Sequence, residues 1–253
     1  MKLLRNSRSA RQAGFSLIEL LIVIAILGLI IGAVFSQVGV AQQRLNAEEL
    51  KLDDFQQARD FVDQFFRDIN QAGSPNIRMY DPSATGFTAF QSPAINDSRL
   101  AVGLVMIDSN AITFEGAVNG TGTVQSVTYK INGAGTCTYC LFRSQTDKQN
   151  GSSVTGQASP NWGTEVNDVD LTKAIFRYYQ YDGTQITSLP VDISTAAGAQ
   201  TIANVKTIQI NLTIRNANVI DQQTGLPIET TFEGEISLNN CSMASTGQPM
   251  SCQ

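Results

Sequence analysis

One ionisable side chain lies against a long apolar run near the N-terminus. Every residue from Leu20 to Phe35 is apolar or glycine, and Glu19 directly precedes this run. With residues 15–19 included, the run reaches the roughly 20 residues that a membrane-spanning helix requires. A charged carboxylate inside such a helix costs about 2.5 kcal/mol or more. Glu19 therefore needs a compensating positive charge, and membrane insertion alone does not explain it.

Basic residues without acidic neighbours precede the apolar run. They are Lys2, Arg5, Arg8 and Arg11, and this charge bias places the N-terminus in the cytoplasm. A cleaved secretory signal fits poorly, because the apolar core is long and is followed by a polar helical pattern instead of a small-residue cleavage site. A plain signal anchor explains the basic residues and the apolar run, but it leaves the buried carboxylate unexplained.

Residues 14–19, Gly-Phe-Ser-Leu-Ile-Glu, resemble the type III signal of type IV prepilins. That signal is a basic leader that ends in glycine, followed by phenylalanine, with glutamate as the fifth residue of the mature chain. The resemblance implies that a membrane prepilin peptidase removes residues 1–14 by cleaving between Gly14 and Phe15, and then methylates the amine of Phe15. Glycine at the cleavage site lets the peptidase approach the backbone closely, because it has no Cβ. Glu19 can then pair with the amine of its own Phe15 or of a neighbouring subunit, which is far cheaper in lipid than two lone charges.

Four cysteines lie in the second half of the chain, as Cys137, Cys140, Cys241 and Cys252. A zinc site needs four ligands, and the second pair is widely spaced with no histidine to help. A redox Cys-x-x-Cys motif normally opens a helix, whereas this one lies among strand and turn signals. An oxidising compartment favours disulfides. Of the three possible pairings, proximity favours Cys137–Cys140 with Cys241–Cys252, and the second bridge would close a C-terminal loop, as in many pilins.

No set of residues predicts catalysis. The chain has no histidine, no phosphate-binding glycine loop and no nucleophile elbow, so the usual general base and metal ligand are missing. Glu165, Asn167, Asp168 and Asp170 could bind Ca²⁺, but their spacing is not that of an EF-hand, and a solvated acidic loop is the alternative. We therefore expect no catalytic residues, no metal and no cofactor.

The overall charge argues against nucleic-acid binding. The net charge is −5, and removal of residues 1–14 takes away four basic residues and no acidic one, which leaves −9. A chain this acidic does not bind DNA by neutralising phosphates. Charged residues make up only 15% of the chain, against about 25% in typical soluble domains.

A helical pattern continues beyond the apolar run. We divide the helix into an apolar assembly segment, residues 15–40, and an amphipathic segment, residues 41–73, which ends at a Gly-Ser-Pro stop. The apolar stripe of the second segment has helical spacing, and we expect it to pack against a sheet of the same chain instead of forming a coiled-coil stalk. It begins at Val38, at the end of the first segment, and continues through Ala41, Leu45, Leu52, Phe55, Val62, Phe65 and Ile69.

Residues 74–253 have the alternating pattern of half-buried strands. Residues 127–131 and 208–214 alternate clearly, and Asp182-Gly183 predicts a hairpin between two further strands. Residues 144–172 are polar and rich in glycine and serine, which predicts a long surface loop. The fold class is therefore α+β and pilin-like, with one long N-terminal helix packed on an antiparallel sheet.

Three later segments are similar to PilW-like minor pilins and to pseudopilin J of type II secretion. They are residues 66–73, Phe-Arg-Asp-Ile-Asn-Gln-Ala-Gly, residues 176–183, and residues 204–215 with their Val-Lys-x-Ile-x-Ile-x-Leu-x-Ile-Arg run. The resemblance implies a minor subunit that primes or caps a type IV pilus. Its implied partners are the prepilin peptidase and N-methyltransferase, other pilins and minor pilins, the inner-membrane assembly platform and membrane lipid. The implied location is the bacterial inner membrane, with the head in the periplasm, and then the filament.

Two alternatives to a pilus subunit remain. One keeps the architecture but places the chain in a type II secretion pseudopilus, as a J-like pseudopilin. The other is a membrane-anchored extracellular enzyme, against which the absence of histidine counts.

The leader assignment predicts the effect of a substitution at the cleavage site. Gly14→Val should leave an uncut precursor, because a β-branched side chain blocks close approach of the peptidase to the backbone. Intact mass of the protein from its native membrane measures both the cut and the methyl group. A variant that still yields a mature chain starting at Phe15 would show the leader assignment to be wrong.

Overall fold

The computed structural model describes most of the chain. It covers residues 16–75, 97–131, 137, 139–151, 154–157, 161–220 and 225–238, apart from the side chains of residues 217–219. Gly14, Phe15, Cys241 and Cys252 lie outside the described residues.

The first element is a helix of 55 residues, α1, which covers Leu17–Gln71. Contacts within the chain divide it into two units, residues 1–49 and residues 50–253. This division does not test the predicted boundaries of the apolar and amphipathic helix segments at residues 40 and 73, which stay predictions. The last residue of the helix is Gln71. Gly73, two residues later, has the positive φ of 77° that a helix C-terminal cap requires.

In the first unit, α1 exposes its apolar side chains. Each large hydrophobic residue that the structure describes between Leu17 and Val38 is exposed. Within the described part of the chain, α1 is the one helix that is long and apolar enough to cross a membrane. A helix that is apolar all round is stable in lipid or in a protein core, not in water.

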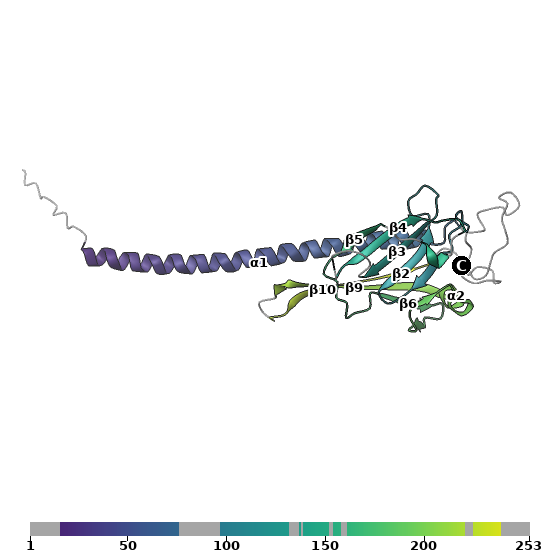
Figure 1. The fold of residues 1–253 in the computed structure, drawn as a ribbon. Coiled ribbons are helices and arrows are strands. Elements are labelled where there is room, and N and C mark those ends of the chain that lie inside the picture. The colour runs from purple at the N-terminus through teal and green to yellow at the C-terminus, as the bar shows by residue number, and fades with distance from the viewer. Residues whose placement is uncertain are drawn as a thin grey trace, which may run out of the picture. The chain divides into compact units, whose positions relative to one another are not determined.

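The second unit contains two antiparallel sheets (Figure 1). The larger has the strand order β5-β4-β3-β2-β1-β8. Its strands are β1 Leu104–Ile107, β2 Ala111–Gly116, β3 Gln125–Ile131, β4 Leu141–Asp147, β5 Trp162–Val166 and β8 Val191–Asp192. A short 3-10 helix, Val154–Gly156, lies between β4 and β5 in the sequence.

The smaller sheet has the order β10-β9-β6-β7. Its strands are β6 Phe176–Gln180, β7 Gln185–Ile186, β9 Val205–Ile220 and β10 Pro227–Ser237. A second helix, α2 Ala196–Ala203, comes before β9 and begins at Thr195, whose side chain accepts a hydrogen bond from the backbone of Gly198.

The α+β class and the antiparallel pairing are confirmed, including the hairpin of β6 and β7 around Asp182-Gly183. Two details differ from the sequence prediction, because the head has two sheets instead of one and residues 144–172 are not a single loop. Residues 144–147 complete β4, and β5 lies within the same stretch. Ser144 is buried, Gln145 and Thr146 are half-buried and Asp147 is exposed, and since all four are polar, this end of β4 lacks the alternating apolar pattern that predicts a strand.

Phe65 of α1 joins the two sheets. Its ring lies 5.3 Å from that of Tyr129 on β3 and 5.4 Å from that of Phe176 on β6, measured between centroids. Ala58, Phe61 and Ile69 are buried on the same helix face. The prediction that the helix packs against its own sheet is confirmed from Phe55, whose ring contacts Phe232 of β10, to Ile69, whereas Leu45 and Leu52 are exposed.

Two glycines allow close approach of α1 to the strands. A Cβ at Gly234 of β10 would meet the ring of Phe66 at 2.8 Å. A Cβ at Gly116 of β2 would clash with the backbone carbonyl of Gln71, beside the bridge between Ala72 and Gly116. The second contact involves rigid backbone on both sides, so the helix end cannot move away without losing its bridge.

This close approach predicts a stability difference between two glycine substitutions in the larger sheet. Gly116→Ala should lower the free energy of unfolding by about 1–3 kcal/mol, because the added methyl overpacks a backbone contact. Gly163→Ala in β5 is the matched control, since its Cβ would lie 3.9 Å from the nearest atom, the carbonyl oxygen of Arg143. Thermal unfolding of the two variants in detergent measures the difference. Equal midpoints would contradict the packing of the helix end on β2.

Candidate functional site

Glu19 lies in the first turn of α1. Its backbone N–H donates to the carbonyl oxygen of Ser16 at 3.0 Å, and its position leaves the side chain exposed. Because Gly14 and Phe15 lie outside the described residues, the cleavage site, the methylated amine and the pairing of that amine with Glu19 stay predictions.

A buried carboxylate, Asp68, ties α1 to the larger sheet. Its Oδ2 atom accepts hydrogen bonds from the Tyr129 hydroxyl at 2.7 Å and from Arg143 Nε at 2.9 Å, and Arg143 Nη2 lies 2.7 Å away. Its Oδ1 atom accepts from Gln64 Nε2 at 2.6 Å. Asp68 is 2% exposed, so this set of contacts replaces water around a charge that burial alone would make unfavourable.

The surrounding groups keep the protonation states that this arrangement needs. Burial raises the pKa of Tyr129, and the nearby charge of Asp68 raises it further. The phenol therefore stays protonated and acts as a donor to the carboxylate. The Arg143 guanidinium also lies over the Tyr129 ring, 5.8 Å from its centroid, which adds an attraction between the cation and the ring.

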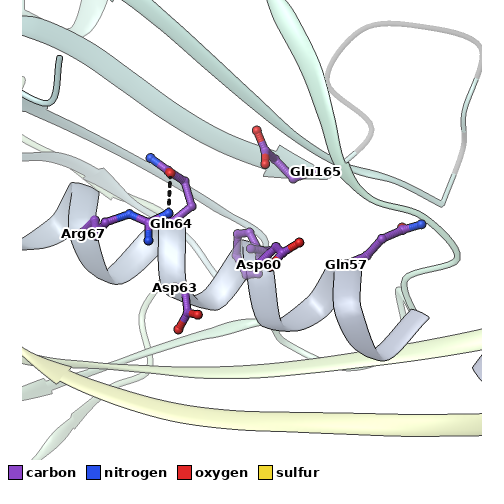
Figure 2. A pocket seen from close by; sticks show the side chains of 7 residues that line it. Gln57, Asp60, Asp63, Gln64, Arg67 and Glu165 are labelled. Carbon is purple, nitrogen blue, oxygen red and sulfur yellow. Dashed lines mark hydrogen bonds between the residues drawn. The ribbon is translucent and has the colours of Figure 1, made fainter. Parts of the chain in front are cut away.

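A shallow pocket lies beside this cluster, between α1 and β5 (Figure 2). The side chains around it are mainly carboxylates and amides, from Gln57, Asp60, Phe61, Asp63, Gln64, Arg67 and Glu165. Arg67 donates to the Gln64 side chain at 2.9 Å, as the dashed line in Figure 2 marks. Burial raises the pKa of Glu165, while the charge of Arg143 lowers it. The pocket is therefore polar and acidic.

A second buried ion pair holds the start of the larger sheet. Lys148 Nζ lies 2.7 Å from Glu115 Oε2, and both side chains are 0% exposed. Lys148 also donates to the carbonyl oxygen of Leu100 at 2.9 Å, and the Val102 N–H donates to the same Glu115 oxygen at 3.1 Å. This pair anchors residues 100–102 to the end of β2, and its burial identifies it as a structural contact.

The predicted carboxyl cluster does not assemble into a metal site. Asn167 donates to Gln57 of α1 at 3.2 Å, and Asp170 accepts from the backbone and hydroxyl of Thr172 at 2.9 and 2.7 Å. Glu165 points to the pocket of Figure 2. Among the described residues, no group of three or more potential metal ligands comes together.

Cys137 and Cys140 form a disulfide in the structure, with their Cα atoms 5.7 Å apart. The bridge closes a short loop directly before β4, and the carbonyl oxygen of Tyr139 within it accepts from the Val169 N–H at 2.8 Å. Cys241 and Cys252 lie outside the described residues, so their pairing stays a prediction.

The comparison with protein families matched the N-terminus. Residues 9–35 match the model described as the prokaryotic N-terminal methylation motif. The chain carries a type IV prepilin-like leader. Neither the curated proteins nor the solved structures gave a match. The motif supports a type IV pilin-like or pseudopilin-like protein, and the leader with its apolar helix fits a membrane-anchored subunit. The match ends at residue 35, so the resemblance to PilW-like minor pilins and pseudopilin J stays a prediction.

Sequence reasoning did not identify the contacts of Asp68. The signal was present, because a charged residue lies three positions after Phe65 and directly before Ile69, on the face that the apolar spacing predicts to be buried. The partners Tyr129 and Arg143 are more than 60 residues away in the sequence, so nothing local could have named them.

The cluster predicts that Asp68→Ala is strongly destabilising. Removing the carboxylate leaves Arg143 and the Tyr129 hydroxyl without their acceptor, which should cost about 3 kcal/mol of unfolding free energy. Asp63→Ala is the matched control, because Asp63 is an exposed carboxylate on the same helix. Chemical denaturation of both variants compares the two. A loss for Asp68→Ala no larger than for Asp63→Ala would show that the cluster does not stabilise the head.

Proposed function

We propose that the mature chain is a minor subunit of a type IV pilus, which enters the filament after leader cleavage and primes or caps it. The observation that carries this proposal is the match of residues 9–35 to the N-terminal methylation motif. A structural subunit accounts for the leader, the long apolar helix and the β-rich head together.

In this proposal the protein is first stored in the inner membrane. The basic residues 1–14 stay in the cytoplasm, the apolar part of α1 spans the bilayer, and the head lies in the periplasm. The prepilin peptidase cleaves after Gly14 on the cytoplasmic side and methylates Phe15. Because the apolar segment remains on the chain, cleavage prepares the subunit for assembly and does not release it.

Glu19 then acts in assembly. The new amine of Phe15 is a cation at the edge of the apolar segment, and Glu19 lies about one helical turn further along. When the helix leaves lipid for the apolar interior of a filament, a pair formed with a neighbouring amine is much less costly than two separate charges. Such a pair forms at one axial position only, so it would set the register between subunits.

The head supports a minor role instead of a bulk subunit. The residues that resemble PilW-like minor pilins and pseudopilin J include Arg67 and Asp68 of α1 and residues 205–215 of β9. In the structure, Asp68 binds the larger sheet, and β9 forms the centre of the smaller one. The resembling segments therefore form the packing of the head itself. The amount of this protein relative to the main pilin in sheared filaments tests the role, and a ratio near one would contradict it.

The leader motif is equally compatible with a type II secretion pseudopilus. Deletion of the gene separates the two, because loss of surface filaments with normal protein secretion indicates a pilus. Loss of secretion with intact filaments would instead indicate a J-like pseudopilin.

The role of Glu19 gives the most direct test of assembly. Glu19→Ala removes a costly charge from the apolar segment, so membrane insertion and leader cleavage should survive. Entry into the filament should fail, because the Phe15 amine loses its carboxylate partner. Glu19→Gln should fail in the same way, since it keeps the shape and removes the charge, and Glu19→Asp should be intermediate.

Immunoblots of sheared filaments and of membranes measure this outcome, with leader removal checked by mass. Glu49→Gln is the matched control, because Glu49 is an exposed carboxylate of α1 outside the apolar run. If Glu19→Ala and Glu19→Gln enter filaments at the level of the control, charge pairing does not guide assembly.

A further inference from the structure

The ion pair of Lys148 and Glu115 is fully buried, yet one of its atoms is left without a hydrogen bond. Both side chains are 0% exposed, and Lys148 Nζ lies 2.7 Å from Glu115 Oε2. The other carboxylate oxygen, Oε1, is also buried and has no hydrogen-bond partner among the described residues. Burying two charges is favourable only when their remaining atoms are satisfied as well. As an ion pair, this contact is therefore incomplete.

The neighbouring backbone groups match an amide better than an ion pair. Lys148 Nζ donates to the carbonyl oxygen of Leu100 at 2.9 Å, and the N–H of Val102 donates to Glu115 Oε2 at 3.1 Å. A secondary amide has one N–H donor and one carbonyl acceptor. If Nζ were bonded to the Glu115 carboxyl carbon, Cδ, and Oε1 were lost, the amide N–H would keep Leu100 as its acceptor. Its carbonyl oxygen, Oε2, would keep Val102 as its donor, and no unpartnered atom would remain.

The backbone holds the two side chains in position for this reaction. The Glu115 N–H donates to the carbonyl oxygen of Gly103 at 2.8 Å, and the Lys148 N–H donates to that of Val124 at 3.0 Å. Because Oε2 is bonded to Cδ, Nζ lies within about 4 Å of that carbon, and reacting atoms are typically about 3–3.5 Å apart before a bond forms. Rotation about the last torsion of the glutamate side chain, which has a broad range, is enough to bring the carbon toward the amine.

The surroundings favour the uncharged forms that react. Burial raises the pKa of the Glu115 carboxyl, although the charge of Lys148 opposes this effect. A proton passed from the ammonium to this carboxylate leaves a neutral amine, which is the nucleophilic form, beside a carboxylic acid. The Val102 N–H at Oε2 is then placed to stabilise the negative charge that this oxygen carries after attack on Cδ.

We propose that Lys148 and Glu115 join in an intramolecular isopeptide bond. The lone pair of Nζ forms the new bond to Cδ, and the bond between Cδ and Oε1 breaks. Oε1 leaves as water with the carboxylic acid proton and one proton of the amine, so the step needs no oxidant, reductant or cofactor. Ser126 lies opposite Glu115 in the β2–β3 ladder, and its buried hydroxyl, which has no partner among the described residues, can donate to the departing oxygen.

Such a bond would strengthen the sheet where the helix meets it. The carbonyl oxygen of Glu115 accepts from the N–H of Gly73, directly after α1, at 2.8 Å. Tension that enters through α1 therefore reaches the larger sheet at the end of β2, and the bond connects this point covalently to Lys148, the residue after β4. The value of this link to a filament subunit rests on the proposed function, whereas the bond itself does not.

Tryptic mapping of the protein from its native membrane tests the proposal. The chain is denatured, its disulfides are reduced, and the peptides are measured by mass. Trypsin does not cut at an acylated lysine, so we expect residues 100–130, which contain Glu115, joined to the uncut peptide 144–173, which contains Lys148. The joined species should be lighter than the sum of its two peptides by one water molecule. Intact mass alone does not suffice, because a succinimide at Asp182-Gly183 loses one water as well, and mapping places that loss in residues 178–206.

The pair of Lys173 and Glu229 is the matched control within the same digest. These residues have the same chemistry at 3.3 Å, but their side chains are 44% and 42% exposed. Trypsin should cut at Lys173, and the peptide that begins at residue 216 should be free. Lys148→Arg keeps the positive charge and supplies no reactive amine, since guanidinium stays protonated. In this variant trypsin should cut at position 148, and residues 100–130 should be free.

Three results would overturn the proposal. Wild-type protein that yields free peptides 144–148 and 149–173 would show that the contact stays an ion pair. A crosslink between Lys173 and Glu229 of equal extent would show that proximity alone joins such residues, so the buried site would have no special role. A joined species that persists in Lys148→Arg would assign the bond to another residue. If that variant does not fold, the wild-type digest and its internal control still decide between a bond and an ion pair.

Discussion

The second unit depends on one face of α1. The two sheets have no hydrogen-bonded ladder in common among the described strands, and Phe65 contacts an aromatic ring from each of them. One turn further along the same face, Asp68 binds the hydroxyl of Tyr129 and the guanidinium of Arg143. The aromatic contact supplies apolar burial without a fixed direction, whereas the ion pair fixes the rotation of the helix, because a buried charge tolerates no misplaced partner.

Much of this fold could be predicted from local patterns. The apolar run, the Gly-Ser-Pro stop and the alternation in β3 and β9 each depend on neighbouring residues, so they give the helix, its end and the strands. The division into two sheets could not be predicted, because pairing between strands depends on residues far apart in the sequence. The strand at residues 144–147 was missed for a related reason. Its residues, Ser-Gln-Thr-Asp, are all polar, so they lack the apolar alternation that identifies a half-buried strand.

The candidate functional residues also divide into those that the local sequence predicts and those that only the fold brings together. The predicted leader site, formed by Gly14, Phe15 and Glu19, lies within six neighbouring residues, so it could be proposed from the sequence alone. The cluster around Asp68 is the opposite case, since its partners come from β3 and β4. Only the helix residue was visible in advance, as a charge on an apolar face. The carboxylates at residues 165–170 are close in sequence and yet separate in the structure, because strand geometry sends Glu165 and Asp170 to different neighbours.

The buried core has a consequence for assembly. Every member of the hydrophobic core that the structure describes comes at or after Ala58, whereas the side chains of α1 that require lipid come before residue 40. The two sets do not overlap, although they belong to one continuous helix. A subunit that exchanges lipid for neighbouring subunits changes the surroundings of the first set only, and none of the contacts of Phe65 or Asp68 has to break. Under the proposed function, the exchange of lipid for neighbouring subunits therefore leaves the packing of the head on α1 unchanged.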